Sequence, residues 1–416
     1  MTRIPRYALW TVVALALLLA AAVTVLRFVA PFRQAEADRQ WAESFESMDA
    51  LRAKYASAPD SAAALKLAVL ARPIGIPLAR SETSSVDKTP ALIALARFVN
   101  EWGRKADDGP AEPPAGEVAE FLSRTRAEVD AIEAHLLADR PVTWAIDLRD
   151  GQEQQVPPLS GLRSLGDVLL ARAIAAAGRG DAAAARRSLN AAERLTLTVR
   201  DRPEMISQLI LAALLGRGNA VMRRLPVEAL ASVDPPVRDW KAAMLRAYQT
   251  EVLVFSASVR SAGPAPGGEH VSLRNRLMRY VLVDLSLADY SAQMYRMAVQ
   301  LRSADPCALD AEAFSKDVER WLPRWNIIGQ SAMSGLSNVW IAAAQIAFDD
   351  ELTRLVLRAK TRASAAALPA RVASGVCSSV NWTIETLAGG DVQIATDRQP
   401  FARPVASTFR VHRPAR

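Results

Sequence analysis

The sequence is short of the residues that metal and nucleotide chemistry needs. It has two cysteines and three histidines in 416 residues, with no Cys-x-x-Cys and no histidine pair at metal-ligand spacing. It contains no P-loop, dinucleotide-binding glycine fingerprint or Gly-x-Ser-x-Gly elbow. We therefore expect no cofactor, no metal site and no catalytic residues.

Long basic runs are also missing, although basic residues are abundant. The chain carries 51 lysines and arginines against 44 acidic residues, and the net charge of +7 is modest for this length. Since no run of five basic residues occurs, the sequence gives no support for a nucleic-acid partner. Half of the residues are hydrophobic and 23% are charged, which is typical of a globular protein.

The longest uncharged apolar run lies at the N-terminus. Residues 7–26 contain no charged side chain, and Arg3 and Arg6 precede them. At about 1.5 Å per helical residue, this run matches a bilayer core of about 30 Å. It predicts an uncleaved transmembrane anchor within residues 1–33. The alternative is a signal peptide cut near Ala20-Ala21-Ala22, although the apolar run continues past that point.

An anchor with a basic N-terminal tail implies a single-pass protein of a bacterial inner membrane, with the bulk of the chain in the periplasm. Both cysteines, Cys307 and Cys377, follow the anchor. An even number of cysteines in an oxidising compartment predicts a disulfide between them. Two buried thiols that never meet remain the alternative.

Helical periodicity dominates the chain after the anchor, and the fold class is therefore mainly α. Proline, glycine and capping residues divide it into an irregular stack of helical hairpins. The predicted units are an anchor at 1–33, membrane-proximal helices at 34–104, a linker at 105–116, a helical-hairpin domain at 117–376 and a C-terminal element at 377–416.

Residues 178–195, GRGDAAAARRSLNAAERL, predict a corner between two helices. Gly178 and Gly180 end the first helix, and Asp181 caps the second. The Arg-Gly-Asp tripeptide is then a structural corner and not an adhesion ligand. A similar motif, Gly216-Arg-Gly-Asn219, follows 38 residues later and could form a second corner. Residues 203–224 also suit a single continuous helix.

This corner, with Ala173 before it and Ala185, Leu189 and Ala192 after it, resembles one tetratricopeptide repeat. The match covers about 30 residues and lacks the large aromatic residue and the closing proline of that motif. In element order, the chain resembles membrane-anchored helical envelope proteins whose roles are unassigned. That resemblance implies placement in the envelope and nothing about a substrate.

The last 40 residues change character. Val380, Trp382 and Ile384 alternate with polar residues, and Gly389-Gly390-Asp391 follows as a turn before a second alternating run. We expect a small β-hairpin or meander here, followed by a basic tail.

The segment RWLPRWN brings together Arg320, Trp321, Arg324 and Trp325. Tryptophan and arginine are enriched where protein partners bind tightly, so these four residues are a candidate partner-binding site. Their helical spacing with Phe314 and Val318 also suits tryptophans that face the core.

These observations favour a non-enzymatic protein that presents a periplasmic helical domain for protein–protein interaction or envelope scaffolding. Its expected partners are the membrane, through the N-terminal helix, and another envelope protein. The alternative is an envelope enzyme, such as a hydrolase of a cell-wall polymer, whose active site is assembled from distant residues. A deep pocket with convergent carboxylates would favour the enzyme, and a broad groove would favour the scaffold. The sequence does not decide homo-oligomerisation.

Overall fold

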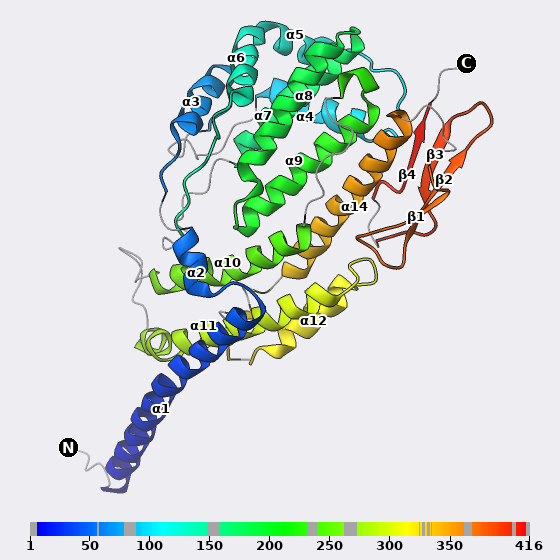
Figure 1. Ribbon diagram of the computed structural model, residues 1–416. Coiled ribbons are helices and arrows are strands. Elements are labelled where there is room, and N and C mark those ends of the chain that lie inside the picture. The colour runs from blue at the N-terminus through cyan, green and yellow to red at the C-terminus, as the bar shows by residue number, and fades with distance from the viewer. Residues whose placement is uncertain are drawn as a thin grey trace.

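The computed structural model shows a mainly helical protein with a small antiparallel sheet near its C-terminus (Figure 1). The residues it describes are 6–55, 58–78, 89–148, 159–230, 239–261, 273–323, 325–326, 329–330, 333, 335–361, 368–401 and 405–412. The predicted fold class is confirmed at this level, whereas the likeness to tetratricopeptide repeats stays a prediction.

The first helix, α1 (Arg6–Ser44), joins the apolar N-terminal run to the amphipathic segment that follows it. Its beginning extends away from the rest of the molecule, and its second half packs on α11 (Leu273–Ser303), as Figure 1 shows. Trp41 is fully buried at this contact, and Arg33 forms an ion pair with Asp289 at 2.8 Å. The short helix α2 (Met48–Lys54) follows, capped by Ser47.

A first group of helices packs above α11 in Figure 1. Its members are α3 (Ala62–Ala71), α4 (Pro90–Gly103), α5 (Gly116–Arg124), α6 (Arg126–Leu137), α7 (Leu159–Gly178), α8 (Ala182–Arg200) and α9 (Met205–Arg224). The apolar spacing of residues 117–138 suits one helix, but the structure has two helices there, with a break at Thr125. The Thr125 hydroxyl donates a 2.8 Å hydrogen bond to the Phe121 carbonyl, which competes with a continuing helix.

The predicted corner lies between α7 and α8. Gly178 is the last residue of α7, and Gly180 has a φ of +76°. Asp181 accepts a hydrogen bond from the backbone N–H of Ala184 at 3.0 Å and so caps α8. By contrast, Gly216 and Gly218 lie inside α9, so the second Gly-Arg-Gly is part of a continuous helix.

The structure describes five further helical elements. These are the short 3-10 turns η1 (Arg72–Ile74) and η4 (Val227–Ala229), and the helices α10 (Trp240–Ser261) and α12 (Ala311–Trp321). The long helix α14 (Leu336–Thr361) then runs beside α9. Gly216 permits this approach, because a Cβ at that position would lie 2.9 Å from Cδ1 of Ile346.

Buried apolar side chains form two clusters in the described residues. One joins α3 through α9, and the other joins α1, α2, α10, α11, α12 and α14 to the sheet. Helices α9 and α14 contribute to both: Leu211 and Leu357 belong to the first cluster, and Met205 and Trp340 belong to the second. The two clusters are therefore held together mainly through this pair of helices.

The sheet is a four-stranded antiparallel meander in the order β1-β2-β3-β4. Its strands are β1 (Arg371–Ala373), β2 (Asn381–Thr386), β3 (Val392–Thr396) and β4 (Thr408–Val411). Trp382 of β2 is buried and stacks on Phe348 of α14, with ring centres 4.5 Å apart. The alternating pattern thus predicted the inward face of β2 correctly, although β1 was not expected.

Residues 105–116, predicted as a linker, contact several elements. The Asp107 carbonyl accepts a 2.7 Å hydrogen bond from Arg224 of α9. Asp108 forms an ion pair with Lys360 of α14 at 3.2 Å, and its backbone N–H donates to the Arg410 carbonyl of β4. The proposed domain boundaries themselves stay a prediction.

One helix among the described residues is long and apolar enough to cross a membrane, and it is α9. In its most apolar window, 44% of the residues are buried within the protein, and a buried core helix meets the same criteria. These criteria do not single out the expected N-terminal span, which stays a prediction.

The corner yields a prediction about stability. Gly180→Val should destabilise the fold by ~1–2 kcal/mol or more, because a side chain strongly disfavours positive φ. Asp181→Ala should lose a cap that contributes about 1 kcal/mol. Arg179→Ala is the matched control and should change the free energy of unfolding little. Denaturant titration of the three variants measures this order, and an unchanged Gly180→Val midpoint would contradict the corner.

Candidate functional site

A large cleft lies between the two hydrophobic clusters in the part of the chain that the structure describes. It is a cleft of about 960 Å³ lined by α8, α9, α10 and α14. This volume is within the range typical of ligand-binding sites. The cleft is larger than the second hollow, of about 520 Å³, which Arg320 and Leu322 help to line.

The turn between α8 and α9 forms one end of the cleft, and a buried arginine fixes it. The Arg202 guanidinium donates 3.0 Å hydrogen bonds to the carbonyls of Trp144 and Ala145. It also pairs with the buried carboxylate of Glu204. Since its nitrogen atoms are used in these contacts, Arg202 is a structural part of the cleft wall.

Most of the lining is apolar or small. Leu211 and Leu215 come from α9, Met244 comes from α10, and Ala343 and Ile346 come from α14. Leu215 and Ala343 are partly exposed, whereas Leu211 and Met244 are buried. Apolar side chains that stay partly open to solvent form a surface suited to an apolar ligand.

Polar groups gather where α9 faces the middle of α14. Asp350 forms an ion pair with Arg354 at 3.4 Å, and Asn219 of α9 lies beside this pair. Burial raises the pKa of Asp350, because it disfavours the charged carboxylate, and the charge of Arg354 counteracts this rise. At this point of the lining, a carboxylate, a guanidinium and an amide lie together beside apolar walls.

The neighbouring acidic residues of α14 have structural roles. Asp349 accepts a 2.8 Å hydrogen bond from Arg223 of α9. Glu351 accepts hydrogen bonds from Ser374 at 2.6 Å and from the backbone N–H of Gly375 at 2.7 Å. Successive helical residues point about 100° apart. Asp349 faces α9, whereas Asp350 and Glu351 both reach the lining of the cleft.

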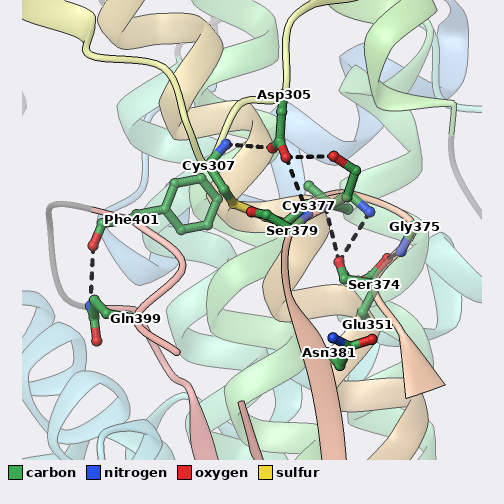
Figure 2. Close-up of a disulfide and its surroundings, with 12 residues drawn as sticks. Asp305, Cys307, Glu351, Ser374, Gly375, Cys377, Ser379, Asn381, Gln399 and Phe401 are labelled. Carbon is green, nitrogen blue, oxygen red and sulfur yellow. Dashed lines mark hydrogen bonds between the residues drawn. A yellow bond between two sulfur atoms is a disulfide. The ribbon is translucent and has the colours of Figure 1, made fainter. Parts of the chain in front are cut away.

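Cys307 and Cys377 form a disulfide, with Cα atoms 5.5 Å apart. Figure 2 shows it beside Asp305, which accepts hydrogen bonds from the backbone N–H of Cys307 at 2.9 Å and from the Ser378 hydroxyl at 2.6 Å. Asp305 and the two cysteines bring possible metal ligands within 4.8 Å of one another. In the oxidised form both sulfur atoms are bonded and the carboxylate is occupied by these hydrogen bonds.

The candidate partner-binding residues do not occupy the large cleft. Arg320 is exposed and pairs with Asp317, and Trp321 is half-buried against Phe314. Trp325 is 40% exposed, and Arg324 lies outside the described residues. Trp321 therefore packs against a residue of its own helix, and Trp325 is open to solvent.

The two histidines that the structure describes are also apart from the cleft. His135 contacts the Ala63 carbonyl through Nε2 at 2.8 Å, and His412 contacts Asp391 through Nδ1 at 3.0 Å. His270 lies outside the described residues.

Sequence reasoning missed the residues that give the cleft its polar character, Asn219, Asp350 and Arg354. Asn219 had been considered only as part of a second helix corner. The run Asp349-Asp350-Glu351 within an otherwise apolar helix was the available signal, because charged residues in a core-facing segment need partners or a function.

Comparison of the chain with known protein families, with characterised proteins and with solved structures finds no match.

The environment of Asp305 predicts how stability depends on pH. Burial alone would raise its pKa, but hydrogen bonds from Ser378, Cys307 and Ser379 outweigh burial and lower the pKa below its ordinary value of 3.8. A lowered folded-state pKa means that ionised Asp305 stabilises the fold above about pH 4. This contribution falls away as the pH drops through the lowered pKa.

We therefore expect Asp305→Asn to be less stable than the wild type at neutral pH, with the difference shrinking as the pH falls below 4. Denaturant unfolding of both proteins between pH 7 and pH 3 measures the difference. Asp49→Asn is a suitable control, because Asp49 is exposed and pairs only with Arg52 in its own helix. A difference that grows towards low pH would contradict this role of Asp305.

Proposed function

We propose that this chain is a non-enzymatic, single-pass protein of a bacterial inner membrane that presents a periplasmic domain for interaction with another envelope protein. The observation that carries the binding role is the apolar cleft between α8, α9, α10 and α14. In this proposal, the cleft receives an apolar helix of the partner.

Two features of the cleft, and a common mode of protein recognition, support a helix as its occupant. Its walls are themselves helices, which offer ridges and grooves to another helix. The small residues Ala212, Ala343 and Ala347 are part of the lining, and small side chains let helices approach closely. Partner recognition by an apolar helix in a groove is also a common mode of protein binding.

The anchor is supported by the side chains of α1. Large apolar residues of this helix are exposed, including Trp10 at 71% and Phe32 at 74%. Together with the charge-free run at 7–26, this exposure suits a helix that is surrounded by lipid. The disulfide supports the placement of the remaining chain, because such bonds persist mainly in oxidising compartments.

The topology has a direct test in cells. Reporters fused at Ala58 and at the C-terminus should be active only when the reporter functions in the periplasm. In the same cells, Cys307 and Cys377 should resist thiol labelling until a reductant is added, because they form a disulfide. Cytoplasmic activity of both fusions, or two freely labelled thiols, would contradict the proposed location.

The binding role can be tested with a photo-crosslinking amino acid placed in the full-length protein in living cells. Positions Leu215 and Ala343 lie in the cleft and are partly exposed. Both should give crosslinks to the same protein, whereas the probe at Glu120, an exposed residue of α5, should give none. Equal labelling at all three positions, or none in the cleft, would contradict the proposed function.

A further inference from the structure

Helices α1 and α11 lie side by side and run in the same direction. Arg33 of α1 pairs with Asp289 of α11 at 2.8 Å. Further along, the hydroxyl groups of Ser44 and Tyr295 share a 2.8 Å hydrogen bond, and Arg302 donates to the Ser44 carbonyl. The partners in these contacts are 251 to 258 positions apart in the sequence. Since this separation stays nearly constant, the two helices advance together and form a parallel pair.

This register carries α11 towards the bilayer that α1 is proposed to cross. The charge-free run of α1 ends at Leu26, about 10 Å before Arg33. The first residue of α11, Leu273, lies farther back from Asp289, by about 24 Å of helix. With the offset of the Arg33–Asp289 pair, Leu282 is level with Leu26, and the first turns of α11 lie beyond that level. In Figure 1, α11 begins on the side of the molecule from which α1 extends.

The exposed side of α1 marks where the lipid ends. Val25, Phe28 and Phe32 are exposed by 59%, 69% and 74% of their surface. Their spacing of three and four residues places them on one face of the helix. Glu36 continues this face with an exposed charge that pairs with Arg39. The apolar face therefore extends beyond the charge-free run and ends at Phe32, so the start of α11 lies on the lipid side of this boundary.

The composition of the first turns of α11 indicates how deep they lie. Residues 273–283 contain no acidic residue and three basic ones, Arg274, Arg276 and Arg279. Charged side chains are costly in the hydrocarbon core, whereas arginine is favourable beside phosphate groups. Leu282 and Val283 are partly exposed. A helix that combines arginines with exposed apolar residues is suited to the headgroup layer of a membrane.

We infer that α11 is a second membrane contact, whose first turns at residues 273–283 lie in the headgroup layer beside α1 and bind phospholipid. This inference rests on the proposed anchor and adds a second attachment to it. A single spanning helix leaves the domain free to rotate about that helix. Two contacts side by side hold the domain in one orientation on the bilayer.

The test places the photo-crosslinking amino acid at three positions of the full-length protein in cells, and mass spectrometry identifies what is attached. Val283 should give a phospholipid adduct. Val299 is the matched control: it is an exposed valine of the same helix, but it lies on the far side of Asp289 from the bilayer and should give no lipid adduct. Leu17, 65% exposed in the charge-free run, reports on the anchor alone.

The three positions separate the inference from the proposed function. A lipid adduct at Leu17 without one at Val283 would overturn the second contact and leave the anchor standing. A crosslink from Val283 to a second copy of the chain or to another protein, or equal lipid labelling at Val299, would also overturn it. Absence of lipid at Leu17 would overturn the anchor as well.

Charge variants test the binding of headgroups. The variant Arg274→Gln/Arg276→Gln/Arg279→Gln should lower the lipid yield at Val283 about tenfold, because the attraction to phosphate groups is lost. The yield at Leu17 and the melting temperature of the purified protein should stay unchanged. Arg179→Gln, which removes an exposed arginine at the helix corner, is the control and should change neither yield. An unchanged yield at Val283 in the triple variant would overturn the binding of phospholipid by these turns.

Discussion

The packing of α14 against α9 is the interaction on which the rest of the structure depends. Both hydrophobic clusters take side chains from these two helices, and the sheet packs on α14 through Phe348 and Trp382. Three consecutive acids then fix α14 by polar contacts on three sides. Asp349 bonds to α9, Asp350 faces the cleft, and Glu351 bonds to the segment before β2. A rotation of α14 would break the contacts of Asp349 and Glu351 together, because both are made to other elements.

The cleft follows from the same arrangement. The two clusters meet at α9 and α14, and the cleft lies at this junction. Buried ion pairs such as Arg223–Asp349 contribute little net stability, because both charges lose their hydration. Their effect is to fix the relative orientation of the two helices, and hence the shape of the cleft.

The parts of the structure that could be predicted are those encoded locally. Pro90 and Asp310 mark the starts of α4 and α12, and the alternation around Trp382 marks β2. Thr125 shows the limit of periodicity, because the apolar pattern of 117–138 continues across a break that one hydroxyl stabilises. The cleft could not be predicted, since Asn219 and Asp350 are 131 positions apart and meet only when α9 and α14 pack. Local sequence patterns do not indicate which helices pack against each other in the folded protein.

The disulfide has a mechanical consequence. It joins Cys307, four residues after the end of α11, to Cys377, four residues before β2. Since α1 packs along α11, a force on α1 is passed to α11 and then, through a covalent bond, to the sheet. This route bypasses α10, so such a force reaches the sheet without passing through that helix of the cleft wall. Reduction of the bond would instead direct that load through the noncovalent helix contacts beside the cleft.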